Sequence, residues 1–184
     1  MAKIEFETVK TALKRGGVIA YPTEAVYGLG CDPHNEQAVM RLLAMKQRDI
    51  DSGLIIIGAT FAHIENFISE LPENNREVIL SSWPGPNTWL IPASEHCPSF
   101  IRGMHLSVAV RVISHPVAKE ICNIFGGAIV STSANIHGAL PARTAKEVRQ
   151  VFGTLVDTIV DAPVGNSINP STIRDAITGK KIRG

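Results

Sequence analysis

Apolar and polar positions along the chain follow two periods, one typical of helices and one typical of strands. Apolar residues from Phe6 to Leu13 recur at helical spacing and predict a helix that ends at Gly16-Gly17. The continuous apolar run at 18–21 is typical of a buried strand, and Pro22 ends it. The first unit is therefore a helix followed by a strand.

The same two patterns predict further elements over the whole length. A helical stripe at Val39, Leu42 and Leu43 follows Asn35, a residue type that caps helices. Further helices are expected at approximately 61–69, 74–82, 115–125 and 144–152. Strands are expected at 54–57, 88–91, 107–112, 128–131, 155–160 and 171–174. This mixture predicts an α/β domain around a twisted sheet, and it leaves the strand order open.

Composition places the chain among ordinary globular proteins. Its 184 residues, 45% hydrophobic and 19% charged, fit one domain over 1–184 and do not fit a disordered segment. No apolar run reaches the length of a membrane span, and the amino end lacks the apolar region of a secretory signal. We therefore expect a cytoplasmic protein with no membrane partner. Three scattered cysteines fit reduced thiols, and no Cys/His cluster indicates a zinc site.

A net charge of +1 and a pI near 7.8 argue against a dedicated nucleic-acid binder, which would be strongly basic. Basic residues do gather in three short stretches, at 41–48, 143–149 and 180–183. Each stretch could be a local anion-binding patch, or only a solvated helix face or tail.

Three segments have the residue types of a ligand site. Residues 21–30 place hydroxyls, a carboxylate and two glycines directly after a buried strand, which fits either a binding loop or a structural turn. Lys46 and Arg48 at a helix end could clamp phosphate oxygens, or could be favoured there by the helix dipole alone. The hydroxyls and amide of 130–135 could bind anionic oxygens or cap a turn. No Walker A sequence, complete GxGxxG or serine-nucleophile elbow is present.

Seven short motifs occur in the order found in the Sua5/YrdC family, which the chain resembles over nearly its whole length. They are YPTEAVYGLG at 21–30, KQR at 46–48, WPGPNT at 83–88, SVAVRV at 107–112, HP at 115–116, VSTSANIHG at 130–138 and PSTI at 170–173. In length the chain is similar to the short bacterial YrdC (TsaC) form. The resemblance implies an α/β fold whose twisted mixed sheet curves around a large, positively charged cleft, with helices on the outside.

The resemblance also implies an activity, that of a nucleotidyltransferase. Such an enzyme joins L-threonine, bicarbonate and ATP into L-threonylcarbamoyl-adenylate and releases pyrophosphate, with Mg²⁺ carried by the ATP rather than by a protein metal site. The product would pass to a tRNA threonylcarbamoyl transferase complex, which makes N6-threonylcarbamoyladenosine at position 37 of tRNA. An RNA-binding module without catalysis and a transferase subdomain that uses carbamoyl phosphate are the alternatives, and contact with RNA could accompany the enzyme.

Residue roles follow from the same resemblance. Lys46 and Arg48 are expected to be exposed and catalytic, because they would neutralise phosphate and transition-state charge. The ATP-binding residues would be Arg48, Ser52, Ser133, Asn135, Pro141 and Arg183. The threonine-binding residues would be Thr23, Arg111, Ser131 and Ser171, with Tyr27 and Thr88 lining the cleft.

The chain departs from the family pattern after the KQR motif. Many relatives have Asn-Pro-Leu followed shortly by His, whereas this sequence has Ser52-Gly53-Leu54 and then Ile57. Ser52 can still donate a hydrogen bond, but Ile57 cannot replace the polar contact of a histidine. Ala25, where a second Thr is often found, is a milder change.

Overall fold

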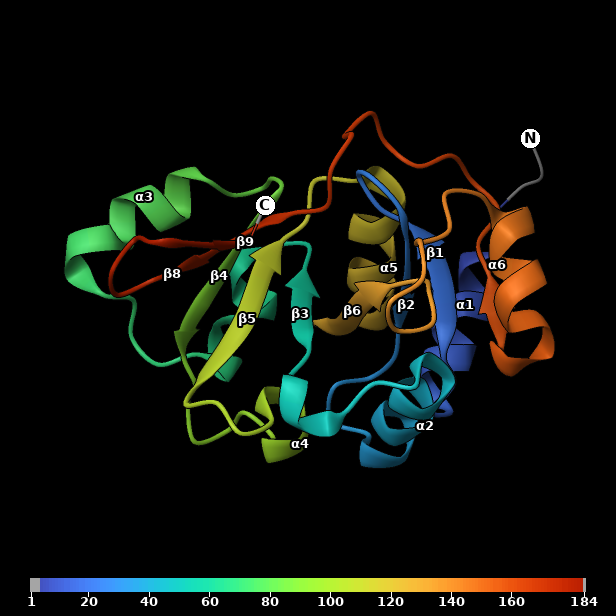
Figure 1. Ribbon diagram of the computed structural model, residues 1–184, viewed down its shortest axis with the longest axis horizontal. Helices are drawn as coiled ribbons and strands as arrows, with labels where there is room; N and C mark the ends of the chain where they lie inside the picture. The colour runs from blue at the N-terminus through green and yellow to red at the C-terminus, as the bar shows by residue number, and fades with distance from the viewer. Residues whose placement is uncertain (1–3, 184) are drawn as a thin grey trace.

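The computed structural model describes residues 4–183, and its centre is one nine-stranded mixed sheet (Figure 1). The strand order is β7-β1-β2-β6-β3-β5-β4-β8-β9. The strands are β1 (Ile19–Pro22), β2 (Tyr27–Gly30), β3 (Ile55–Gly58), β4 (Asn87–Pro92), β5 (Ser107–Val112), β6 (Ile129–Ser133), β7 (Thr158–Ile159), β8 (Thr172–Asp175) and β9 (Lys181–Arg183). Three strand pairs, β3–β5, β1–β7 and β4–β8, are parallel and the other five are antiparallel, so the predicted α/β class with a mixed sheet is confirmed.

Six α-helices within residues 4–183 accompany the sheet. They are α1 (Phe6–Lys14), α2 (Glu36–Lys46), α3 (Arg76–Ser81), α4 (Ser99–Arg102), α5 (Pro116–Phe125) and α6 (Ala145–Phe152). Short 3₁₀ turns are η1 (Ile50–Ser52), η2 (Phe61–His63), η3 (Glu65–Phe67), η4 (Glu73–Asn75) and η5 (Gly153–Leu155). In Figure 1, α3 lies beside β8 at one end of the molecule, and α1 and α6 lie at the other end.

Some sequence predictions were wrong in type or extent. The helix expected at 61–69 is two 3₁₀ turns, η2 and η3, because Phe67 and Ile68 turn into the core rather than continue a helical stripe. The strand expected at 155–160 shortens to β7, since Gly153–Leu155 forms a 3₁₀ turn first. The sequence patterns missed β2, α4 and β9, which are short elements of three or four residues.

Neighbouring residues on the central strands pack into two different cores, which places the cores on opposite faces of the sheet. Ile56 and Val130 belong to a larger core with residues of α2, α3 and α6. Ile57 and Ile129, one position along the same strands, belong to a smaller core with residues of α1 and α5. The sheet is therefore covered by apolar packing on both faces at its β1–β2–β6 end.

The sequence of β5 shows how the sheet face that carries the smaller core becomes polar toward β4 and β8. Val108, Val110 and Val112 point into the larger core, whereas Ser107, Ala109 and Arg111 point to the other face. Ala109 pairs with Ile55 of β3, and Ile55 in turn pairs with Ser131 of β6. Isoleucines of β3 and small, polar and charged side chains of β5 and β6 thus form a floor that none of the helices within residues 4–183 covers.

Helix α2 has a defined start and an unusual end. The Asn35 side chain accepts a hydrogen bond from the Ala38 N–H at 3.0 Å, which confirms the predicted cap. The helix ends at Gln47, whose φ of 51° and ψ of 45° lie in the left-handed region. Because Gln47 turns the chain there, Lys46 and Arg48 leave the helix end in different directions.

A segment without regular structure, residues 161–171, crosses the molecule from β7 to β8, and we call it the strap. Since β7 is at one edge of the sheet and β8 is next to the other edge, the strap must span most of the strands. In Figure 1 it is the orange-red loop that arches over the upper side. The Tyr27 hydroxyl donates to the Ala162 carbonyl at 2.5 Å, and the Thr172 N–H donates to the Pro86 carbonyl at 3.0 Å.

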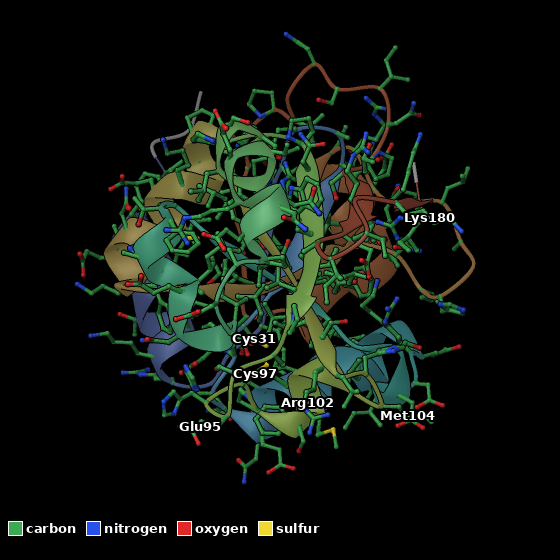
Figure 2. The ribbon with its side chains drawn as sticks, turned by 90° about the vertical axis from the view of Figure 1, so that its left-hand side faces the viewer. Cys31, Glu95, Cys97, Arg102, Met104 and Lys180 are labelled. Atoms are coloured by element: carbon green, nitrogen blue, oxygen red, sulfur yellow. The ribbon has the colours of Figure 1, made fainter. Side chains whose placement is uncertain are left out.

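Neither a disulfide nor a membrane-spanning helix is found within residues 4–183. Cys31, Cys97 and Cys122 are all free and buried, and the first two lie in the interior in Figure 2. Within residues 4–183, none of the helices combines the length and apolar character needed to cross a membrane.

The left-handed conformation of Gln47 leads to a stability prediction. We expect Gln47→Gly to be tolerated and Gln47→Val to be less stable than Gln47→Gly by about 1–2 kcal/mol, because a β-branched side chain is strained in this region. Urea unfolding of both variants measures the difference. Ala44→Val, at an exposed position of the same helix, is the matched control and should cost less than ~1 kcal/mol. Equal stabilities of the two Gln47 variants would contradict the assigned backbone conformation.

Candidate active site

A cavity of about 590 Å³ lies over the uncovered floor of the sheet. Its lining comes from alternate positions of β3 and β5, from the end of β6, and from the β1–β2 loop, the strap and β9. Strands β3 and β5 are parallel, so their starts share one end of the cavity and their carboxyl ends share the other. We call these the entry end, near Gly53 and Ser107, and the exit end, near Arg111.

Most of the residues proposed from the sequence are brought together by this cavity. Its lining includes Thr23, Tyr27, Arg48, Ser52, Arg111, Ser131, Ser133, Pro141, Ser171 and Arg183. Three others, Lys46, Asn135 and Thr88, are not part of the lining. Ten of the thirteen residues named from the sequence thus line one cavity, whereas Lys46, Asn135 and Thr88 do not reach its open space.

Arg48 and Arg102 line the entry end beside Gly53, and the charge of Arg183 from β9 acts on Arg48. The Arg48 guanidinium donates through Nη2 to the Gly53 carbonyl at 3.0 Å, and its Nε is buried without a hydrogen-bond partner in residues 4–183. Burial and the nearby charge of Arg183 lower the pKa of Arg48. An anionic ligand is favoured beside Arg48, because it would offset the charge of Arg183 that acts on this guanidinium.

Lys46 is buried, so the expectation of an exposed lysine was wrong. Its side chain is 2% exposed, and its ammonium donates to the backbone carbonyls of Ser133 and Asn135, the latter at 2.8 Å. Burial and the charge of Arg48 lower the pKa of Lys46 to about 8. The helix end carries Lys46 under the loop that follows β6, and there it holds that loop in place.

Asn135 also acts from behind the cavity wall. Its Oδ1 accepts a hydrogen bond from the Ser133 hydroxyl at 2.6 Å, and its Nδ2 donates to the carbonyls of Ile136 and Ala139 at 2.9 Å each. The Ser133 hydroxyl is thereby oriented by Asn135, while Ser133 itself lines the cavity. The amide of Asn135 thus organises the loop rather than facing the open space.

The exit end contains a buried ion pair. Arg111 Nη2 lies 2.5 Å from Glu24 Oε2, and Arg111 Nε donates to the Gly85 carbonyl at 2.8 Å. Desolvation acts to raise the pKa of Glu24, but the charge of Arg111 and hydrogen bonds from Ser114 outweigh it and lower the pKa. The carboxylate is therefore ionised at neutral pH, and the guanidinium is fixed from two sides.

The two side chains proposed to line the cleft have other roles. Thr88 was placed there wrongly: it is fully buried, and its hydroxyl donates to the Ser171 Oγ at 2.9 Å. Ser171 lines the cavity, and Thr88 lies behind it. Tyr27 lines the cavity, but its hydroxyl is engaged by the Val160 and Ala162 carbonyls at the start of the strap.

The departures from the family pattern also lie at the cavity. Ser52 and Gly53 line the entry end, next to Arg48. Ile57 pairs with Arg111 across β3 and β5 and is almost fully buried in the smaller core, although it borders the cavity. An apolar side chain at this place packs beside Arg111 and makes no hydrogen bond to it.

Sequence reasoning missed several residues of the lining. Glu24 was noticed as a carboxylate in the first motif, but no role was given to it, and Asn169, Arg102 and His105 were not singled out. Asn169 belongs to the strap, which has no periodic pattern. The one available signal for Glu24 was its place between Thr23 and the glycines of a loop that follows a buried strand.

The donor set of the cavity does not resemble a protein metal site. Within residues 4–183, no group of three His, Cys, Asp or Glu side chains is arranged to hold a metal ion. Glu24 is the single carboxylate in the lining of that region, and Arg111 and Ser114 already engage it. The hydroxyls and guanidinium groups that face the cavity are instead donors suited to anionic oxygens such as those of phosphate or carboxylate.

The chain belongs to the Sua5/YrdC family. The family model named Sua5_yciO_yrdC, with the description "Telomere recombination", matches residues 11–183. The motifs quoted from the sequence are thus part of a match that covers the strands and loops of the cavity.

Particular relatives within this family are close to the chain. A protein of Cellvibrio japonicus named threonylcarbamoyl-AMP synthase is 49% identical over 93% of this chain and 90% of its own length. A protein of the same name from Pseudomonas aeruginosa is 48% identical over 93% and 92%. The crystal structure of P. abyssi Sua5 complexed with L-threonine is 34% identical, with a TM-score of 0.87. It covers 94% of this chain, which spans 52% of that longer protein.

The lowered pKa of Lys46 predicts a dependence of stability on pH. The folded protein releases this proton near pH 8, whereas the unfolded chain keeps it up to about 10.5. Between these values unfolding takes up a proton, so the free energy of unfolding rises with pH. We expect the stability of the wild type relative to Lys46→Met to increase by about 1–3 kcal/mol between about pH 7 and about pH 10.

Urea unfolding at several pH values measures this difference. Burial raises the pKa of the Cys31 and Cys122 thiols to about 12, which lowers stability at alkaline pH. Because both thiols are present in both proteins, their effect cancels in the comparison. Parallel stability curves for the wild type and Lys46→Met would show that Lys46 titrates with an ordinary pKa.

Proposed function

We propose that the protein is an L-threonylcarbamoyladenylate synthase. The observation that carries the proposal is one cavity with Arg48 at its entry end, Arg111 clamped at its exit end, and the charge of Arg183 acting on Arg48. Such a cavity fits two anionic substrates that must be held close together. The names of the curated relatives support the same activity, and those relatives match this chain over most of their length.

The entry end would bind the triphosphate of ATP. Arg48 and Arg183 supply charge that forms no ion pair within residues 4–183, and Ser133 supplies an oriented hydroxyl. Ser52 and Pro141 border the same space and would contact the nucleotide. Lys46 and Asn135 would act through the loop that they hold, which refines the direct contacts proposed for them from the sequence.

The exit end would bind L-threonine. The Arg111 guanidinium is suited to the amino-acid carboxylate, because two of its nitrogens are fixed by the protein and Nη1 remains for a ligand. Thr23, Ser131 and Ser171 offer hydroxyls around the same end. The structure of P. abyssi Sua5 with L-threonine supports a threonine site in a closely similar fold.

The chemistry requires positioning rather than an enzyme nucleophile. The threonine amine captures carbon dioxide derived from bicarbonate and loses a proton, which gives a carbamate. A carbamate oxygen then attacks the α-phosphorus of ATP, and the bond to pyrophosphate breaks. The products are threonylcarbamoyl-adenylate, pyrophosphate and the water released from bicarbonate. Holding both anions in one cavity with fixed cations lowers the barrier to this step.

Mg²⁺ would enter with ATP and neutralise part of the phosphate charge. The Ser133 hydroxyl, which faces the cavity, is the group that could contact the phosphate-bound ion or its waters. In this proposal the product then passes to a tRNA threonylcarbamoyl transferase complex. The concave cavity favours small substrates over the alternative of an RNA-binding module without catalysis.

Incubation with ATP, Mg²⁺, bicarbonate and L-threonine tests the proposal. We expect mass spectrometry to detect threonylcarbamoyl-adenylate, and we expect it to disappear when threonine or bicarbonate is left out. Product formation from carbamoyl phosphate without bicarbonate would instead support the transferase subdomain. Folded, ATP-binding protein that forms no product would support the RNA-binding module, whose affinity should fall steeply with salt.

The role of Arg48 gives a sharper prediction. Arg48→Gln should lower kcat/KM for ATP-dependent pyrophosphate release by about 100-fold or more, because a charge-assisted contact to phosphate is lost. Circular dichroism should show an intact fold, since Arg48 is only half-buried. Arg76→Gln, at an exposed position of α3 outside the cavity, should retain wild-type turnover. Near-normal turnover of Arg48→Gln would exclude Arg48 from the catalytic machinery.

A further inference from the structure

Both carboxylate oxygens of Glu24 are occupied by the protein itself. Oε1 accepts hydrogen bonds from the Ser114 N–H at 2.8 Å, the Ser114 hydroxyl at 2.7 Å and the His115 N–H at 3.2 Å. Oε2 forms the ion pair with Arg111 Nη2. Glu24 thus joins the loop between β5 and α5 to the guanidinium group at the exit end of the cavity.

The facing atoms of this ion pair are closed to any ligand. Glu24 Oε2 and Arg111 Nη2 are both buried, although other atoms of the two residues line the cavity. A substrate can therefore reach Arg111 without touching the carboxylate oxygen that holds it. The geometry fits a residue that fixes the orientation of Arg111 rather than one that contacts the reacting groups.

The strap is attached to the same point of the chain. The Ser167 N–H donates to the Glu24 carbonyl at 3.0 Å, and the Gly165 N–H donates to the Thr23 carbonyl at 2.9 Å. The contact is close, since a Cβ at Gly165 would lie 2.8 Å from the Glu24 carbonyl oxygen. The strap therefore sits directly on the backbone of the residue that holds Arg111.

His115, the residue that follows Ser114, contacts the strap at a third residue, Pro163. His115 is buried, and its Nε2 lies 3.2 Å from the Pro163 carbonyl oxygen. Burial lowers the pKa of His115, so the ring is neutral at physiological pH and donates this hydrogen bond from Nε2. Glu24 accepts from the His115 N–H, so the carboxylate also fixes the backbone that places this ring.

We propose that Glu24 is a positioning residue that holds Arg111 and the strap as one unit around the amino-acid end of the cavity. This inference rests on the proposed function, in which Arg111 binds the threonine carboxylate. Arg48 and Arg183 make none of these contacts within residues 4–183. Loss of the Glu24 contacts should therefore weaken the binding of threonine and leave the binding of ATP unchanged. Seating of the strap and orientation of Arg111 then depend on each other.

Two variants with matched controls test the proposal. Glu24→Gln removes the charge that holds Arg111, and Glu77→Gln makes the same change at an exposed position of α3. Gly165→Ala pushes the strap off the Glu24 backbone and leaves the carboxylate intact. Gly127→Ala is its control, because a Cβ at Gly127 meets no atom within 4 Å.

We expect Glu24→Gln to raise the KM for L-threonine by about 10-fold or more, and Gly165→Ala to raise it by about 5-fold, with the KM for ATP within about 2-fold of wild type. Both controls should match the wild type. In hydrogen exchange, the Gly165 and Ser167 amides of Glu24→Gln should exchange at least about 10-fold faster than those of Glu77→Gln. A residue that only supports the fold would not produce this separation between the two KM values.

An unchanged KM for threonine in the folded variants, or an equal rise in both KM values, would overturn the proposal. If loss of the buried charge prevents Glu24→Gln from folding, Gly165→Ala decides the question, since its change lies on an irregular surface segment. A wild-type protein that makes no product overturns the proposed function instead. The exchange experiment still applies in that case, and unchanged exchange at Gly165 and Ser167 would overturn the link between Glu24 and the strap.

Discussion

A side chain on a strand must point to one face of its sheet or the other, and the rest of this structure depends on that constraint. In β5 the alternation sends three valines into the larger core and places Ser107, Ala109 and Arg111 on the opposite face. The same register continues through Ile55 and Ser131 on the neighbouring strands. Helices α1 and α5 cover this face at one end only, so the remainder becomes the floor of a cavity rather than core.

Charge gives this cavity its chemical character. Removing cations from water is costly unless they find partners, and here the partners differ from group to group. Lys46 is held by backbone carbonyls, Arg111 is held by Glu24, and Arg48 at the entry end is repelled by the charge of Arg183. A polyanionic ligand at the entry end would offset that repulsion. An amino-acid carboxylate at the exit end would instead use a guanidinium that is already oriented.

The sequence predicted the parts of this arrangement that depend on local patterns. The buried strands and the Asn35 cap follow from periodicity and residue type, and the resemblance to the family supplied the motifs that end at the cavity. The burial of Lys46 and Thr88 could not be predicted in this way, because both positions face the site side of their elements and are covered by segments distant in sequence. The role of Glu24 could not be predicted for the same reason, since its partner Ser114 lies 90 residues further along the chain. The strap has no period at all, and its course is set by the need to connect opposite ends of the sheet.

A crystal structure of the protein with a non-hydrolysable ATP analogue, Mg²⁺ and L-threonine tests the central claim most directly. The account predicts phosphate oxygens beside Arg48 and Arg183, the threonine carboxylate beside Nη1 of Arg111, and the amine pointing along the floor toward the α-phosphate. The Glu24–Arg111 pair should persist with the ligands bound. Phosphates at the exit end, or threonine outside the cavity, would contradict the assignment of the two ends.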